Sequence, residues 1–69
     1  MAFLSYKIRT RRLRDLRRER MLTQAELAAQ AGVHISTVVR AESGENLGRV
    51  SLQAIAKALG VAPLELVQS

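Results

Sequence analysis

Two short helical patterns joined by a glycine turn constrain the fold of this chain more than any other feature. Thr23 is followed three residues later by Glu26, the spacing of a capping box that starts a helix. Gly32 then stands where the end of that helix needs a left-handed residue. A second pattern resumes within three residues, so the sequence predicts helices over residues 24–31 and 35–42. With so little chain between them, the two helices must cross at close range.

That close crossing places demands on particular positions. A small residue is needed where the second helix crosses the first, and Ala28 supplies it. A compact apolar residue is needed to hold the second helix on the first, and Val38 supplies it, with Ala41 one turn later. Because these requirements are met together, the stretch is typical of a helix-turn-helix.

The remaining apolar residues predict three further helices. Leu13 and Leu16 face inward in the first of them, and the last is expected to bring Leu64, with Val67 or Leu66, into the core. The fold class predicted is all-α, a compact five-helix domain. The three helices are expected over residues 10–20, capped by Thr10, residues 52–59, capped by Ser51, and residues 63–67, opened by Pro63.

The N-terminal residues alternate in a different way. Leu4, Tyr6 and Ile8 are separated by polar side chains, which predicts a short extended arm. We favour a partly ordered terminus, with a strand that pairs across a dimer as the alternative. The predicted organisation is an arm over residues 1–8 and a helical domain over residues 9–69.

Positive charge is concentrated in one stretch of the chain. The net charge is +5, and residues 7–20 hold eight basic and two acidic side chains, a net charge of +6. A basic surface on so small a protein indicates a polyanionic partner. Phe3 and Tyr6 are the only aromatic residues, which argues against the stacking platforms that bind single strands.

The residue inventory disfavours other classes of function. The sequence has no Cys and a single His, His34, so we expect neither a metal site nor another cofactor. No carboxylates cluster beside a nucleophile, so we expect no enzyme. No apolar run approaches the roughly 18 residues of a membrane span. A chain of 69 residues leaves no room for an effector domain, and no small-molecule ligand is expected.

The ordered motifs resemble the Cro/CI-type (XRE-like) helix-turn-helix family of transcriptional regulators. The resemblance covers about residues 9–67, and the whole set at these spacings is far more specific than any one fragment. It implies a five-helix domain that binds double-stranded DNA as a homodimer on a palindromic operator, with the third helix in the major groove. The matching fragments are Leu13-x-x-Leu16-Arg17, Leu22-Thr23-Gln24-Ala25-Glu26-Leu27-Ala28, Ala31-Gly32-Val33, Ser36-Thr37-Val38, Glu42-Ser43-Gly44 and Ile55-Ala56-Lys57-Ala58-Leu59-Gly60-Val61.

The resemblance places three residues where the family reads bases: Ile35, Ser36 and Arg40. They also lie opposite the inward-facing positions of their helix. Arg40 has the fork that binds guanine O6 and N7, and Ser36 can donate or accept. Ile35 either packs on a thymine methyl group or touches nothing.

The resemblance places other residues near the DNA backbone. Gln24 falls where the family holds a phosphate, at a helix N-terminus that favours anions. Thr23 is a weaker candidate because it caps the helix. Ser43 is either a backbone contact or a small turn residue, and Arg49 either contacts the DNA or lies free in the loop before the fourth helix. His34 stands where the family has a capping Ser or Thr, so it is either a phosphate contact or an exposed imidazole.

Arg17 and Glu42 match a paired position of the family, and we expect a partly buried ion pair that orients the recognition helix. For the other arginines of the first helix (Arg9, Arg11, Arg14 and Arg18) we favour a solvated face over phosphate contacts. Arg9 also stands where the family is often apolar, and Ile8 is the candidate to replace it.

The resulting hypothesis is a sequence-specific DNA-binding regulator, most simply a repressor, in the cytoplasm on the nucleoid. The alternative is an antitoxin, a restriction–modification controller or a bridging factor that works through a protein partner, either a toxin or the transcription machinery. The dimer surface is expected around Leu47, Pro63, Leu64 and Val67, or on the N-terminal arm; the same apolar residues could instead close the monomer core.

Overall fold

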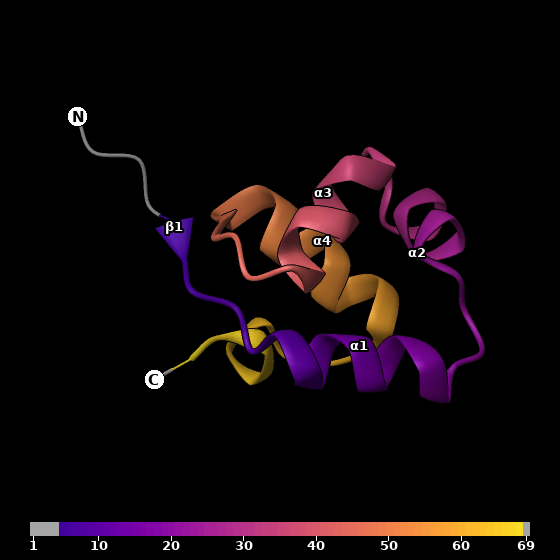
Figure 1. The fold of residues 1–69 in the computed structure, drawn as a ribbon, viewed down its shortest axis with the longest axis horizontal. Helices are drawn as coiled ribbons and strands as arrows, with labels where there is room; N and C mark the ends of the chain where they lie inside the picture. Colours follow the sequence, from indigo (N-terminus) through magenta and orange to yellow (C-terminus); the bar gives the residue numbers. More distant parts are fainter. Residues whose placement is uncertain (1–4, 69) are drawn as a thin grey trace.

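The computed structural model describes residues 5–68, which form four α-helices, two very short strands and one 3₁₀ turn (Figure 1). The helical class of the prediction holds, but the number of α-helices is four rather than five. In chain order the elements are β1 (Ser5–Tyr6), α1 (Thr10–Glu19), α2 (Gln24–Ala31), α3 (Ile35–Glu42), β2 (Leu47–Gly48), α4 (Arg49–Leu59) and the 3₁₀ helix η1 (Pro63–Leu66).

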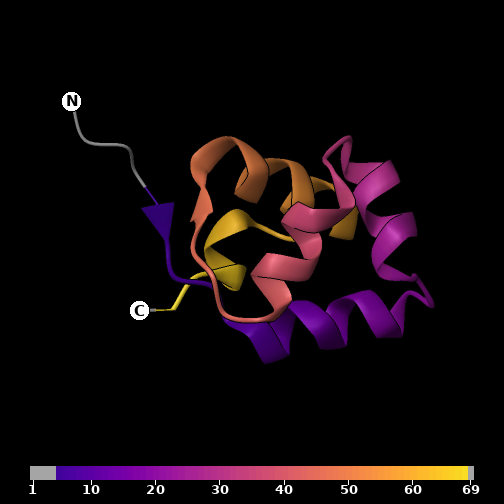
Figure 2. The same cartoon turned by 45° about the horizontal axis from the view of Figure 1, so that its top comes forward.

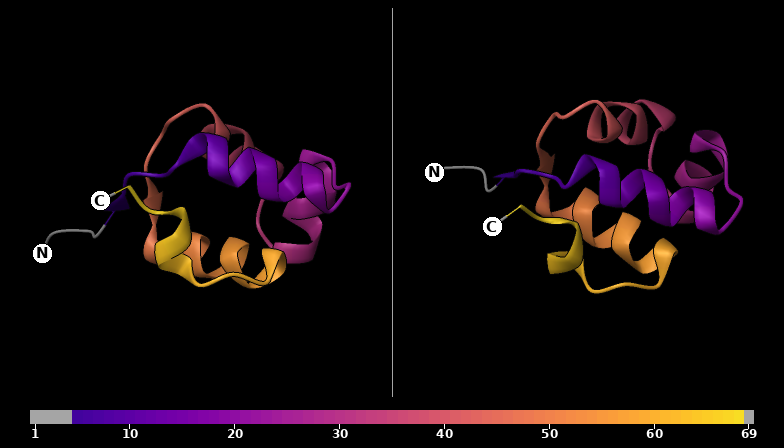
Figure 3. Two further views of the ribbon diagram at one scale, coloured as in Figure 1. Left: turned by 90° about the horizontal axis from the view of Figure 1, so that it is seen from below. Right: turned by 60° about the horizontal axis from the view of Figure 1, so that its bottom comes forward.

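One apolar core lies between the helices. Helix α2 packs against both α3 and α4, while α1 packs against α3 and η1. Figure 3 shows α1 on one side of the domain and α4 with η1 on the other. The largest fully buried side chains come from all of these elements: Leu13, Leu27, Val38, Ile55, Leu59 and Leu66.

The α2–α3 unit begins and ends where the sequence predicts. The Thr23 hydroxyl accepts from the Glu26 amide at 3.0 Å, and the Glu26 carboxylate accepts from the Thr23 amide at 2.9 Å. Gly32 has φ +70°, so α2 ends in the left-handed conformation that glycine adopts without strain. Ala28 and Val38 are both buried at the crossing of the two helices.

Two predicted helix starts are wrong. Helix α1 is preceded by Arg9 rather than by a capping Thr10, and no side chain caps it. Helix α4 begins at Arg49 after Gly48, not after Ser51, which lies inside the helix. Arg49 and Val50 in the first turn of α4 are exposed, so the inward-facing apolar pattern of the helix starts only at Leu52.

The predicted fifth helix is a single 3₁₀ turn, because the chain after it is drawn into extended backbone pairing. Val67 forms an antiparallel bridge with Ile8, and the Gln68 amide donates to the Lys7 carbonyl at 2.8 Å. Leu66 enters the core, whereas Leu64 is 76% exposed, contrary to the prediction.

The extended N-terminal segment pairs within the chain. Ser5 and Tyr6 lie antiparallel to Gly48 and Leu47. Ile8 is buried in the core and Arg9 is exposed, so Ile8 supplies the apolar side chain that the family often has at the position of Arg9. Leu4 of the predicted arm lies outside the described residues. Leu47 is buried in its own domain and therefore closes the monomer core, so it is not part of an open dimer surface.

The ends of the described chain emerge together on one side of the domain (Figure 3). None of the helices described is long and apolar enough to cross a membrane.

Candidate nucleic-acid interface

The outward face of α3 is exposed while its other face is fixed in the core. Val38 and Ala41 are fully buried, and Glu42 beside them is nearly so. At about 100° per residue, the outward side chains fall within an arc of roughly 140°. In Figure 2, α3 lies in the foreground, flanked by α2 and α1. The side chains on this outward arc are Ile35, Ser36, Val39, Arg40 and Ser43.

Two of these five side chains are apolar and three are polar. Ile35 and Val39 are each 42% exposed and stand one turn apart. Within residues 5–68, the Arg40 guanidinium makes no hydrogen bond or ion pair, so its five donors face solvent. The Ser43 hydroxyl donates to the Arg40 carbonyl at 2.9 Å, which makes Ser43 part of the end of α3.

His34 caps α3, a role that the sequence did not predict, and its imidazole is exposed. Its Nδ1 accepts from the Ser36 amide at 3.1 Å, and the same atom lies 2.9 Å from the Ser36 hydroxyl oxygen. An imidazole can cap the helix because Nδ1 is attached to Cγ, as is the side-chain oxygen of the good N-cap residues Asp and Asn. The exposed His34 and the half-buried Ser36 therefore form one unit at the N-terminus of the helix.

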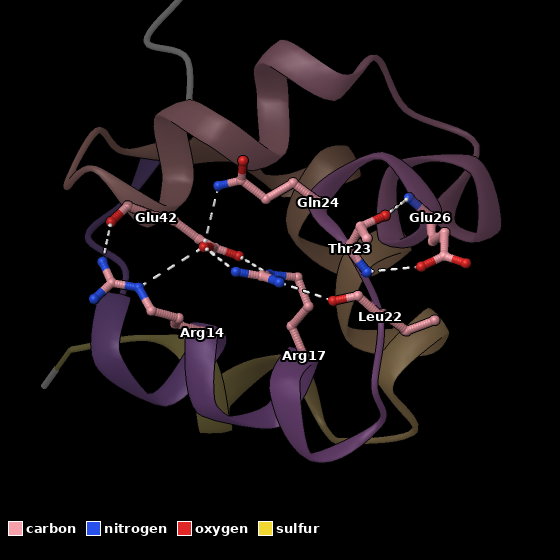
Figure 4. A network of polar contacts seen from close by, with 7 residues as sticks. All are labelled: Arg14, Arg17, Leu22, Thr23, Gln24, Glu26 and Glu42. Carbon is pink, nitrogen blue, oxygen red and sulfur yellow. Dashed lines mark hydrogen bonds and ion pairs between the residues drawn. The ribbon is translucent and has the colours of Figure 1, made fainter.

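The N-terminus of α2 lies next to the end of α3 through Gln24 and Glu42. The Gln24 side-chain nitrogen donates to Glu42 Oε1 at 3.2 Å, and Figure 4 shows the Gln24 carbonyl oxygen pointing away from that contact. Thr23 is exposed and engaged in the capping box. Both predicted backbone-contacting residues of α2 thus have intramolecular partners, and Gln24 is partly buried.

The structure brings Arg17 and Glu42 together in a bidentate pair. Arg17 Nε and one terminal nitrogen donate to the two carboxylate oxygens at 2.6 and 2.9 Å (Figure 4). The other terminal nitrogen donates to the Leu22 carbonyl at 2.8 Å, in the turn before α2. One guanidinium therefore holds α1, the α1–α2 turn and α3 in register.

The same network sets the protonation of the carboxylate. Burial raises the pKa of Glu42, but the hydrogen bonds from Arg17 and Gln24 outweigh it and hold the pKa below its ordinary value. The hydrogen bond to Glu42 in turn raises the pKa of Arg17. The pair is therefore fully charged at neutral pH.

Arginines of α1 extend this polar region toward the surface. Arg14 donates to the Glu42 backbone carbonyl at 3.2 Å, so it is not only part of a solvated face. Beside it a hollow opens between α1 and α3, and its rim includes the exposed Arg18. Arg49 is exposed on the first turn of α4, not in the loop where the sequence placed it. The hollow is lined by Arg14, Arg17, Arg18, Gln24, Val39, Glu42 and Ser43.

Comparison with known proteins agrees with this geometry. The helix-turn-helix family model matches residues 13–66. The chain belongs to the helix-turn-helix family. As such a protein it is a DNA-binding transcriptional regulator, which confirms the family and the general function predicted from the sequence.

A solved helix-turn-helix structure is similar along most of both chains. The restriction-modification controller protein C.AhdI from Aeromonas hydrophila is 37% identical, with a TM-score of 0.75. The similarity covers 81% of this chain and 86% of the controller. No curated protein matches this helix-turn-helix chain.

Sequence reasoning missed Val39 as a surface residue of the helix-turn-helix. Its place four residues after Ile35 would have put it on the outward arc, but a valine next to Val38 was easily read as part of the core. The role of Arg14 at the end of α3 was missed for another reason. It donates to a backbone carbonyl, which leaves no pattern in the sequence, and its 3.8 Å ion pair with Glu42 joins distant parts of the chain.

Proposed function

We propose that this regulator inserts α3 into the major groove of a palindromic operator and represses transcription as a homodimer. The observation that supports this most is the division of α3 into two faces. One face is fixed by the core and by Glu42, and the other presents an Arg40 guanidinium that has no partner within residues 5–68. Arginine bound to guanine O6 and N7 is the commonest base-specific contact in the major groove.

The other outward residues of α3 extend this reading. Ser36 lies toward the N-terminal end of the helix, where side chains of this fold reach base edges. Ile35 and Val39 form a small exposed apolar ridge suited to thymine methyl groups. Recognition of A·T pairs by the ridge and of a guanine by Arg40 would together define a short half-site.

Phosphate contacts would fix the orientation of the protein on the duplex. Gln24 stands at the first position of α2, where backbone amides point outward and attract anions. Thr23, His34, Ser43 and Arg49 are exposed and are proposed as further backbone contacts. Arg14 and Arg18 beside the hollow add positive charge between α1 and α3.

The homodimer follows from the small size of one half-site. One recognition helix reads too few base pairs for specificity in a genome, whereas two related by a two-fold axis would read both halves of a palindrome about 34 Å apart. The exposed Pro63 and Leu64 are the candidate contacts of that dimer. We place the protein on the nucleoid in the cytoplasm and assign it no catalytic role.

Selection of bound sites from a random duplex pool tests the proposal. We expect a palindrome with half-sites one helical turn apart. Arg40→Ala should weaken operator binding by about 1–3 kcal/mol and relax one base position in each half-site. Arg11→Ala removes an equal charge from the exposed surface of α1 and serves as the matched control. Recovery of no palindrome, or equal effects of the two variants, would reject the proposed docking.

A second candidate, control of a restriction–modification system, is favoured by the similarity to C.AhdI over both chains. This role is compatible with DNA binding through α3. It predicts that the selected site occurs upstream of adjacent endonuclease and methyltransferase genes. Occurrence of the site only at unrelated promoters would favour the simple repressor.

A further inference from the structure

Ser36 and His34 form a hydrogen-bonded pair, and the geometry determines which atoms donate and which accept. The Ser36 amide lies 3.1 Å from His34 Nδ1 and can only donate. Nδ1 must therefore carry a lone pair and no proton, which makes the imidazole the neutral tautomer protonated at Nε2.

That tautomer decides the role of the serine hydroxyl. The Ser36 oxygen lies 2.9 Å from the same Nδ1. Because Nδ1 has no proton to give, only the hydroxyl can donate across this contact, and it shares the single Nδ1 lone pair with the Ser36 amide. The only proton of the hydroxyl is then directed at the imidazole, and its two lone pairs are left for a ligand.

We infer that His34 makes Ser36 an obligate acceptor and thereby determines which base edge Ser36 reads. This inference rests on the proposed function, in which α3 lies in the major groove. A free serine hydroxyl can either donate or accept and discriminates poorly between bases. A serine that can only accept needs a donor on the base, and the major groove offers two, the N6 amino group of adenine and the N4 amino group of cytosine. Guanine, whose major-groove edge has only acceptors, is rejected.

Ser36 is placed for such a contact. It is half-buried rather than fully exposed, since one side of its hydroxyl is occupied by the imidazole. Arg40 lies four residues later on the same arc and can only donate. Ser36 would therefore bind an amino group of one base, and Arg40 would bind two acceptors of another base. This difference would fix the orientation of the protein on each half-site.

The test uses the full chain and the operator recovered by site selection. Single adenines are replaced by purine, which lacks the N6 amino group, and single cytosines by the analogue that lacks the N4 amino group. We expect one position in each half-site at which removal of the amino group weakens binding roughly fivefold. Replacement of Ser36 by Ala should abolish that dependence at the same position.

The variant His34→Gly then distinguishes an effect on base recognition by Ser36 from an effect on the stability of the fold. Glycine is tolerated before a helix with little loss of stability, so the variant should remain folded. With the imidazole gone the Ser36 hydroxyl rotates freely, and we expect the penalty for the missing amino group to fall below about twofold. A merely structural role for His34 would lower the affinity for all duplexes alike and leave that penalty unchanged.

The outcomes are distinct. An operator at which neither amino group matters in the Ser36-dependent way, or at which 7-deazaguanine identifies guanine N7 as the Ser36 contact, overturns the inference while leaving the proposed function intact. Failure to recover any operator overturns both. An amino-group penalty that is lost in Ser36→Ala and in His34→Gly, with no further loss in the double variant, supports the inference.

Discussion

Arginines of α1 pair with two glutamates in different parts of the domain: Arg17, with Arg14 at 3.8 Å, holds Glu42, and Arg12 holds Glu65. Arg17 holds Glu42 of α3 at 2.6 Å, with 11% and 4% of the side chains exposed. Arg12 holds Glu65 of η1 at 3.5 Å, with 38% and 46% exposed. The residue types and the helix are the same, so burial and the number of additional partners account for the difference between the pairs.

The difference indicates what each pair does. Glu42 accepts from Arg17 and Gln24, and Arg17 also donates to the Leu22 carbonyl, so three segments are joined at one buried point (Figure 4). Glu65 has only exposed partners. The buried pair orients the recognition helix, whereas the exposed pair contributes mainly surface charge.

The largest effect is expected from truncation of the buried pair. Arg17→Ala should lower the free energy of unfolding by about 3–5 kcal/mol, because it leaves the Glu42 charge buried with weaker partners. Denaturant titration measures the loss. The double variant Arg17→Met/Glu42→Met should recover much of it, since a well-packed apolar pair often replaces a buried ion pair without loss. If Arg17→Ala unfolds at the same denaturant concentration as the parent, the pair has no orienting role.

A smaller effect is expected on acidification. The pKa of Glu42 is lower in the folded chain than in the unfolded one, so the unfolded chain takes up the proton first as the pH falls. Stability should therefore be complete above the ordinary glutamate pKa of about 4.3 and decline as the pH falls from there through the lowered value. Glu42→Gln should show a shallower decline in the same denaturant titrations. The capping-box residue Glu26, whose pKa is lowered by its hydrogen bonds to Thr23, is present in both proteins and serves as an internal reference. Parallel pH profiles for the parent and Glu42→Gln would contradict this account of the buried pair.

The smallest effect is expected from the exposed pair. Arg12→Ala and Glu65→Ala should each change the free energy of unfolding by less than about 1 kcal/mol, because solvent screens the charges and both side chains lose conformational freedom on pairing. Most of that contribution should disappear at 1 M salt, where the screening length is about 3 Å. A loss of unfolding free energy as large as that of Arg17→Ala would contradict the proposed difference between the buried and the exposed pair.

The sequence predicted the α2–α3 unit better than its surroundings because its boundaries are set by local chemistry. The Thr23–Glu26 capping box and the left-handed Gly32 depend only on residues close to them in the chain, so both can be recognised from the sequence. The start of α4 and the nature of η1 depend on contacts with β1 and Ile8, which are distant in sequence. The capping by His34 was missed because it depends on one rotamer of an imidazole, not on a residue type usual at that position.

The candidate interface divides in the same way. The family resemblance and helical periodicity together placed Ser36 and Arg40 on the outward face, and the resemblance paired Arg17 with Glu42. Periodicity could not foresee that Gln24 is engaged by Glu42 or that Arg14 reaches the Glu42 carbonyl. Those contacts come from the packing of α1 and α2 against α3 in the folded core.

The docking of α3 is tested most directly by mapping chemical shifts of the backbone amides during titration with the selected operator duplex. We predict that the largest changes fall on residues 34–43 and on the first turn of α2, with weaker changes around Arg49. A duplex of random sequence at higher salt should produce much smaller changes. If the largest changes instead fall on residues 9–12 and η1, with α3 unaffected, the central claim that α3 reads the DNA is contradicted.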